Sequence, residues 1–199
     1  RAMLERVDAG VGMILAELER HGIADNTLVV FSSDNGGERY ASNAPLFHHK
    51  ATLWEGGIRV PCLMRWPAKL PRGKITHQAG ITMDLTATFL AAAGATLPAG
   101  YKPDGINLLP ILTGEQPGSE RTFYWRIDRS NRKQRAIRQG RWKFLNDGNT
   151  MDLLFDLSTD IGERHNLGYT HPAMLKGLKA KLAAWEAEID RTPREIWVR

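Results

Sequence analysis

The sequence predicts an α/β fold: part of a helix-flanked mixed sheet, followed by a small antiparallel sheet with a C-terminal helix. Three observations predict it. Residues 2–65 place an amphipathic helical pattern before two apolar strand patterns, an order typical of α/β proteins. Residues 122–157 then contain short runs of period two, which are typical of antiparallel strands. Residues 172–189 return to the three- and four-residue spacing of a helix.

The first part of the chain is predicted to hold a helix and two buried strands. Apolar side chains recur every three or four positions over residues 2–21, which predicts an amphipathic helix. Residues 27–31 and 60–65 are apolar at successive positions, so we expect strands that helices bury on both faces. Because Cys62 lies in the second run, we expect a buried, inert thiol there.

A second helix and a boundary follow. Residues 83–93 predict a short helix, with Asp84 suited to its positive N-terminus. Residues 98–118 are rich in proline and glycine, which indicates a boundary between subdomains. We therefore expect one domain over residues 1–118 and a smaller α+β subdomain over residues 119–199.

Short strands and a helix are predicted for the smaller subdomain. The strands are expected at residues 122–127, 134–139, 141–145 and 153–157. In the third of them aromatic side chains share one face, and basic ones, among them Lys143, share the other, which predicts a half-exposed strand. A leucine and tryptophan stripe over residues 172–189 predicts a helix that covers one face of this sheet.

Size and composition exclude some classes of protein. The 199 residues are 42% hydrophobic and 25% charged, and suffice for one large domain or a domain with an appendage. The most apolar stretch, residues 85–98, is too short to span a bilayer, so we expect no membrane partner. The chain begins inside a helical pattern without an initiating methionine, so we expect it to be the back part of a longer protein.

Positive charge is concentrated in residues 126–143. This segment contains eight cations and one acid, while the whole chain has a net charge of +5. Such a segment can form a basic surface for an acidic or sulfated substrate, or simply a solvated strand-and-turn face. The first possibility includes a non-catalytic polyanion-binding module. Nucleic acid is not expected as a partner, because only Trp125 and Trp142 interleave the cations and no nucleic-acid-binding motif is present.

Two oxygen-bearing side chains follow the first predicted strand. Asp34 and Asn35 come just after the apolar run and directly before Gly36 and Gly37. Functional residues of open α/β sheets gather beyond the carboxyl ends of strands, and glycines permit a sharp exit through positive φ. A carboxylate and an amide suit calcium or magnesium rather than zinc, but calcium takes about six to eight ligands, so the others must come from elsewhere or from water. The same residues also fit an Asx turn without a metal.

A basic loop lies close behind in sequence. Near a metal, the ammonium of Lys50 can hold a tetrahedral anion, although an exposed lysine is the commonest outcome for this residue type. His48 and His49 precede it; adjacent loop residues rarely share one ion, so a contact from His49 to a sulfate group is favoured over a zinc site. Glu55 and Arg59 are expected to fix the loop by internal hydrogen bonds.

Several motifs occur in the order found in type I sulfatases of the alkaline phosphatase superfamily. Residues 3–37 resemble the family's helix and strand ending in Ser-Asp-Asn-Gly, and residues 50–61 are similar to its lysine followed by Gly-Gly-Ile-Arg-Val-Pro. Further resemblances lie at residues 78–94, 104–110, 135–143 and 154–167. The chain thus resembles the C-terminal half of an arylsulfatase-like enzyme, with residues 1–118 in its catalytic α/β domain.

The resemblance implies specific roles and a partner. Asp34 and Asn35 would be ligands of one Ca²⁺ site that this chain supplies only in part, and Lys50 a sulfate-binding catalytic lysine. The family's nucleophile is a formylglycine made from a Cys/Ser-x-Pro/Ala-x-Arg motif, which is absent from this chain. We therefore expect the missing N-terminal half of the protein to carry it, and the chain alone to be inactive.

The substrate and the reaction remain open at this point. The resemblance implies a sulfate ester substrate, either an aryl sulfate or a sulfated sugar, and a periplasmic or other extracytoplasmic location. A phosphate or phosphonate ester hydrolase of the same superfamily is the nearest alternative. Two-metal members place histidine after the aspartate, so Asn35 favours a single hard cation.

Overall fold

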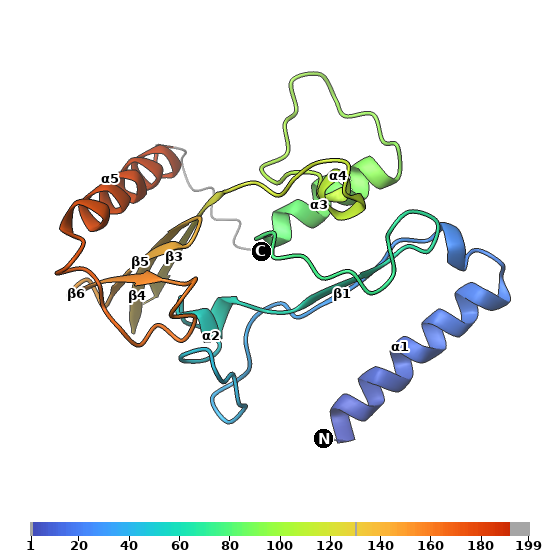
Figure 1. Ribbon diagram of the computed structural model, residues 1–199, viewed down its shortest axis with the longest axis horizontal. Helices are drawn as coiled ribbons and strands as arrows, with labels where there is room; N and C mark the ends of the chain where they lie inside the picture. Colours follow the sequence, from blue (N-terminus) through green and yellow to red (C-terminus); the bar gives the residue numbers. More distant parts are fainter. Residues whose placement is uncertain (1, 130, 192–199) are drawn as a thin grey trace, which may run out of the picture. The chain divides into compact units, whose positions relative to one another are not determined.

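The computed structural model describes residues 2–129 and 131–191, which form two compact units (Figure 1). One unit contains the residues up to Ser32 together with Cys62–Ser119. The other contains Ser33–Pro61 together with the residues from Glu120 onward. The segment 33–61 thus folds with the C-terminal part of the chain, while the assignment of residues 1–118 to a catalytic domain stays a prediction.

The first unit contains the predicted helices and strands. Its elements are α1 (Ala2–Arg20), η1 (Ala24–Asn26), β1 (Val29–Ser32), β2 (Cys62–Arg65), α3 (Thr82–Ala92) and α4 (Leu109–Thr113). β1 and β2 pair antiparallel. Asp84 lies in the first turn of α3, as expected, where its carboxylate accepts the N–H groups of Ile81 at 2.8 Å and Ile106 at 2.9 Å.

The expectation that both strands are buried on both faces is wrong for this unit. Phe31 in β1 is 45% exposed and Leu63 in β2 is 61% exposed. Cys62 is exposed as well, so the expected buried thiol is also wrong. The physical reason is that, among the described residues, β1 and β2 pair only with each other, and a two-stranded sheet cannot bury its own faces. No helix in the described ranges combines the length and apolar character that crossing a membrane requires.

The second unit is built on a four-stranded antiparallel sheet, as predicted. The strands are β3 (Thr122–Arg129), β4 (Arg132–Gln139), β5 (Trp142–Asp147) and β6 (Met151–Asp156), in the order β3-β4-β5-β6. α5 (Pro172–Ile189) lies along one face of this sheet (Figure 1). Leu178 and Leu182 of α5 are buried against a cluster that includes Ile137, Phe144 and Leu154 of the sheet, so the predicted docking of the helix is confirmed.

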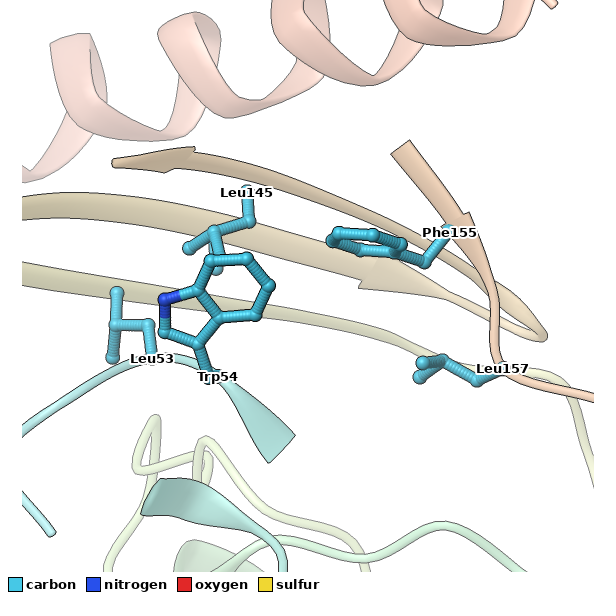
Figure 2. Close-up of a cluster of buried hydrophobic side chains, with 6 residues drawn as sticks. Leu53, Trp54, Leu145, Phe155 and Leu157 are labelled. Carbon is cyan, nitrogen blue, oxygen red and sulfur yellow. The ribbon is translucent and has the colours of Figure 1, made fainter. Parts of the chain in front are cut away.

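The opposite face of the sheet is covered by a segment that lies far earlier in the chain. Leu53 and Trp54, just before α2 (Glu55–Ile58), pack on Leu145 and Phe155 (Figure 2). The prediction of a half-exposed third strand is therefore wrong: Lys143, expected on a solvated face, is 0% exposed. A period-two pattern indicates which residues share a face of the sheet, but it cannot indicate that a distant segment of the chain packs on that face.

Candidate functional site

The predicted metal ligands lie on the turn that follows β1. Asp34 is exposed and Asn35 is half-buried. The hydroxyl of Ser33 donates a hydrogen bond to the carbonyl of Asn35 at 2.8 Å, which holds the turn. Within residues 2–129 and 131–191, neither the Asp34 carboxylate nor the Asn35 amide makes a side-chain hydrogen bond of its own. Both sets of oxygen atoms are therefore free to bind a ligand, and their role as metal ligands stays a prediction.

Two glycine pairs bring the turn against the loop that contains Lys50. The N–H of Gly36 donates to the carbonyl of Gly57 at 3.0 Å, and a Cβ on Gly36 would lie only 1.8 Å from the carbonyl oxygen of Gly56. A Cβ on Gly57 would lie 2.3 Å from the carbonyl oxygen of Thr52. The expectation that positive φ explains the first pair is wrong, because neither Gly36 nor Gly37 has a positive φ. Glycine is required here for close approach of two backbones.

The main chain of Lys50 is tied to this turn. The N–H of Lys50 donates to the carbonyl of Gly37 at 2.9 Å, and Gly37 lies three residues after Asp34. Asn43 reinforces the tie: its side chain accepts the N–H of Gly37 at 2.8 Å and donates to the carbonyls of Gly37 at 3.2 Å and His48 at 3.1 Å. Sequence analysis missed Asn43, because an asparagine that bonds to distant main chain has no periodic signature.

The backbone around Lys50 is strained. His48 and Ala51 adopt left-handed conformations, with φ of 68° and 65°. This conformation costs a residue with a Cβ about 1–2 kcal/mol. Such strain concentrates at functional sites, where the surrounding structure imposes it. Lys50 itself is exposed, and no partner of its ammonium group is found among the described residues.

The two histidines before Lys50 have different environments. His48 stacks on Trp54, with ring centroids 6.4 Å apart and an interplanar angle of 12°. Burial, followed by the charges of His49 and Arg132, lowers the pKa of His48, which favours the neutral ring. His49 is half-buried, and its Nδ1 lies 2.9 Å from the carbonyl of Lys50, so a protonated Nδ1 donates there and Nε2 stays available.

Glu55 and Arg59 fix the loop internally, as expected. A guanidinium nitrogen of Arg59 donates to the carboxylate of Glu55 at 3.0 Å. Burial acts to raise the pKa of Glu55, but the adjacent charges of Lys143 and Arg59 lower it below its ordinary value. Glu55 is therefore an ionised structural group. No group of three or more histidine, cysteine or acidic side chains arranged to hold a metal occurs in the part of the chain that the structure describes.

Four of the eight cations in the basic segment 126–143 are paired with acids. Arg126 forms two 2.8 Å hydrogen bonds to Asp190, and Arg135 pairs with Asp128 and Glu186. A further pair joins Arg141 to Asp156, and Lys143 is buried. These contacts remove much of the charge that a polyanion-binding surface would need.

Solved structures identify the class of fold. The structure titled Ps i-CgsB in complex with k-i-k-neocarrahexaose matches with a TM-score of 0.85 and 35% identity, covering 92% of this chain and 41% of that one. The phosphonate monoester hydrolase of Agrobacterium radiobacter matches with a TM-score of 0.71 and 23% identity over 94% of this chain and 40% of that one, which shows a shared fold alone. The fold is that of the alkaline phosphatase-like hydrolases.

The sequence relatives of this chain are sulfatases. A family model described as Sulfatase matches residues 2–95. N-acetylgalactosamine-6-sulfatase of Homo sapiens is 41% identical over 131 residues, which cover 63% of this chain and 25% of that protein. Arylsulfatase A of Homo sapiens is 34% identical over 221 residues, which cover 94% of this chain and 43% of that protein. The chain is thus similar to sulfatases over most of its length, and it spans less than half the length of the relatives it matches.

Proposed function

We propose that the complete protein containing this chain hydrolyses sulfate esters, and that this chain contributes part of the active site. Asp34 and Asn35 are the proposed calcium ligands, Lys50 the proposed catalytic contact to the sulfate group, and His49 a second substrate contact. The observation that carries the proposal is the bond from the N–H of Lys50 to Gly37, since it ties a lysine with a free ammonium to the turn that contains both oxygen donors.

The donor set fits a hard cation. One carboxylate and one amide whose side chains bond to none of the described residues are suitable ligands for Ca²⁺, which needs about six to eight oxygen atoms in all. A bound calcium ion would neutralise and orient the sulfate oxygens. The Lys50 ammonium would bind a sulfate oxygen and stabilise the negative charge that develops as the S–O bond breaks. His49 would contact the substrate through Nε2.

The nucleophile must come from outside these 199 residues. We propose a formylglycine in the N-terminal half of the same protein, because the chain contains no Cys/Ser-x-Pro/Ala-x-Arg motif. Cys62 cannot replace it, since Leu63, Met64 and Arg65 follow it and the motif is not met. We expect the 199-residue chain alone to hydrolyse no sulfate ester.

A sulfated sugar is the proposed substrate class, with aryl sulfates as assay substrates. The support comes from N-acetylgalactosamine-6-sulfatase, a sugar sulfatase by name, and from the structure bound to a neocarrahexaose. A phosphate or phosphonate ester hydrolase is a weaker alternative, because the matching phosphonate hydrolase shares only the fold. Parallel assays with the sulfate and phosphonate esters of one phenol separate the two reactions.

The decisive experiment removes the Lys50 ammonium. We expect Lys50→Ala in the complete enzyme to lower kcat by about 10²–10³-fold, with a smaller effect on KM, because it removes one charge-stabilising donor. Lys176→Ala, at an exposed position on α5, is the control and should leave kcat unchanged. Formylglycine content must be equal in all variants. A normal kcat in Lys50→Ala would refute the proposed role.

A further inference from the structure

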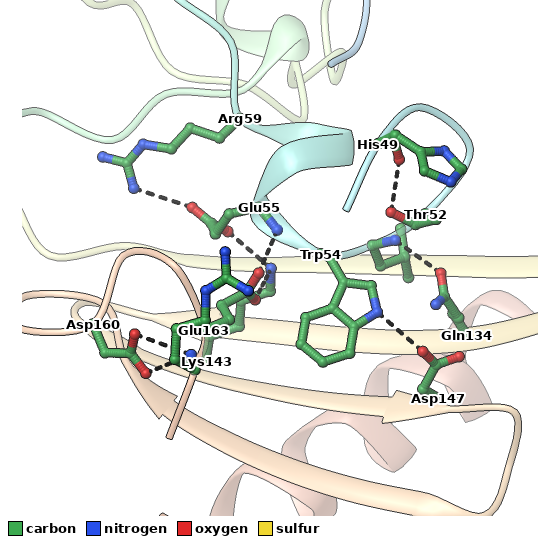
Figure 3. A network of polar contacts seen from close by, with 12 residues as sticks. His49, Thr52, Trp54, Glu55, Arg59, Gln134, Lys143, Asp147, Asp160 and Glu163 are labelled. Carbon is green, nitrogen blue, oxygen red and sulfur yellow. Dashed lines mark hydrogen bonds and ion pairs between the residues drawn. The ribbon is translucent and has the colours of Figure 1, made fainter. Parts of the chain in front are cut away.

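Three of the sequence motifs meet at one buried ion cluster for which the proposed function has no use. Glu55 belongs to motif 50–61, Lys143 ends motif 135–143, and Glu163 lies in motif 154–167. The Lys143 ammonium lies 2.8 Å from a carboxylate oxygen of Glu55 and 2.8 Å from one of Glu163 (Figure 3). All three residues are buried. The second carboxylate oxygen of Glu163 accepts the main-chain N–H of Glu55 at 2.6 Å.

The cluster is the last of several anchors on the residues that directly follow Lys50. The carbonyl of Ala51 accepts a guanidinium hydrogen of Arg132 at 2.9 Å, and the N–H of Leu53 donates to the buried Gln134 side chain at 2.8 Å. The indole N–H of Trp54 donates to Asp147 at 3.0 Å (Figure 3). These partners come from β4 and β5, on the sheet face opposite α5.

Among these anchoring residues, Lys143 is the one whose loss the neighbouring groups cannot compensate. Without it, two buried carboxylates would face each other. Among the described residues, the partly exposed Arg59 would then be the remaining ion-pair partner of Glu55, with Arg138 a second cation nearby. Removing one partner of a buried ion pair leaves an uncompensated charge in a low-dielectric site. Burial raises the pKa of Glu163 even with Lys143 present, and the nearby charge of Glu55 adds to this effect.

We propose that Lys143 is a positioning residue for Lys50. By neutralising Glu55 and Glu163 together, it locks residues 51–57 onto the C-terminal sheet and so sets the place of the lysine that precedes them. The C-terminal sheet then acts as the rigid support of an active-site loop. This inference rests on the proposed function of Lys50.

The test is Lys143→Met in the full-length protein, with amide hydrogen exchange and steady-state kinetics as readouts. We expect exchange at the Leu53 and Glu55 amides to accelerate at least about 10-fold, because their acceptors are Gln134 of β4 and Glu163 of the ion cluster. We also expect kcat to fall by about 10²-fold, since a displacement of about 1 Å can have such an effect. Arg126→Met is the matched control: it removes an ion pair from the other face of the same sheet and should leave both amides and kcat unchanged.

Wild-type protein supplies a second measurement should Lys143→Met fail to fold. In native-state exchange with increasing urea, the amides of Leu53 and Glu55 should open together with those of β4 and β5. Independent opening of the loop at low urea would overturn the inference. So would Lys143→Met with unchanged exchange and kcat in an enzyme that Lys50→Ala inactivates. If instead Lys50→Ala is fully active while Lys143→Met frees the loop, the proposed function fails and the anchoring is supported.

Discussion

Replacing Gly36 by alanine tests whether the site depends on two backbones in close approach. The new Cβ would lie 1.8 Å from the carbonyl oxygen of Gly56 and 2.7 Å from its carbonyl carbon. Non-bonded carbon and oxygen atoms come no closer than about 3.3 Å, so the two segments must separate by about 1.5 Å. That movement breaks the 3.0 Å hydrogen bond from Gly36 to Gly57. Adding about 1 kcal/mol for the bond to about 1–3 kcal/mol for overpacking predicts a loss of about 2–4 kcal/mol.

The assay is equilibrium unfolding in urea followed by tryptophan fluorescence. Gly177→Ala is the matched control, because it adds the same methyl group in the same unit at a position with no atom within 4 Å. Gly177 lies inside α5, where alanine is favoured over glycine by about 1 kcal/mol, so this variant should be more stable than wild type. The same chemical change thus has opposite predicted signs at the two positions. If Gly36→Ala unfolds within about 0.5 kcal/mol of wild type, the close-approach argument is wrong.

Three further predictions concern the helix, the buried acids and the metal. Leu182→Ala should lower the unfolding free energy by about 2–5 kcal/mol in urea titrations, because Leu182 is 3% exposed. Met174→Ala on the same helix, at 37% exposure, should lower it far less. Equal effects would contradict the docking of α5. The pKa of Glu163 is raised, so at pH values above the ordinary pKa of 4.5 the folded state binds more protons than the unfolded state. Wild type should therefore lose stability relative to Glu163→Gln as the pH rises through the folded pKa. A difference in urea unfolding that does not change with pH would refute this. Asp34→Ala in the complete enzyme should lose calcium, measured by isothermal titration, together with activity, and calcium-dependent turnover in this variant would rule the ligand out.

The regular elements were predictable because each carries its own periodic pattern. The leucine and tryptophan stripe of α5 gave both the helix and its buried face, and the four strands of the second unit are close to their predicted positions. The burial of β1 and β2 was not predictable in the same way. An apolar run such as residues 27–31 indicates the environment that the strand prefers, whereas its exposure depends on which layers are present.

The site was predictable as a set of residues but not as an arrangement. We could predict the site residues from their order, a strand followed by Asp34, Asn35 and Lys50, because these groups are close in sequence and match a known family pattern. Asn43 and the bond between Lys50 and Gly37 were not legible, since they depend on the path of an irregular loop. Such contacts depend on how the loop closes in three dimensions, and no local sequence pattern encodes that.

Lys143 shows why a correct strand assignment can lead to a wrong view of a residue. Alternation along β5 placed this lysine opposite Trp142 and Phe144, which is right, and the usual rule for lysine then placed it in water, which is wrong. The rule fails because the covering segment brings its own carboxylate, Glu55, from 88 residues earlier in the chain. A lysine can be fully buried when its charge is paired, and the pairing here requires two acids from two separate motifs. A buried lysine in a strand that reads as amphipathic is therefore a sign that a distant acidic segment packs on that face, and in this chain the segment is the one that leads directly back to Lys50.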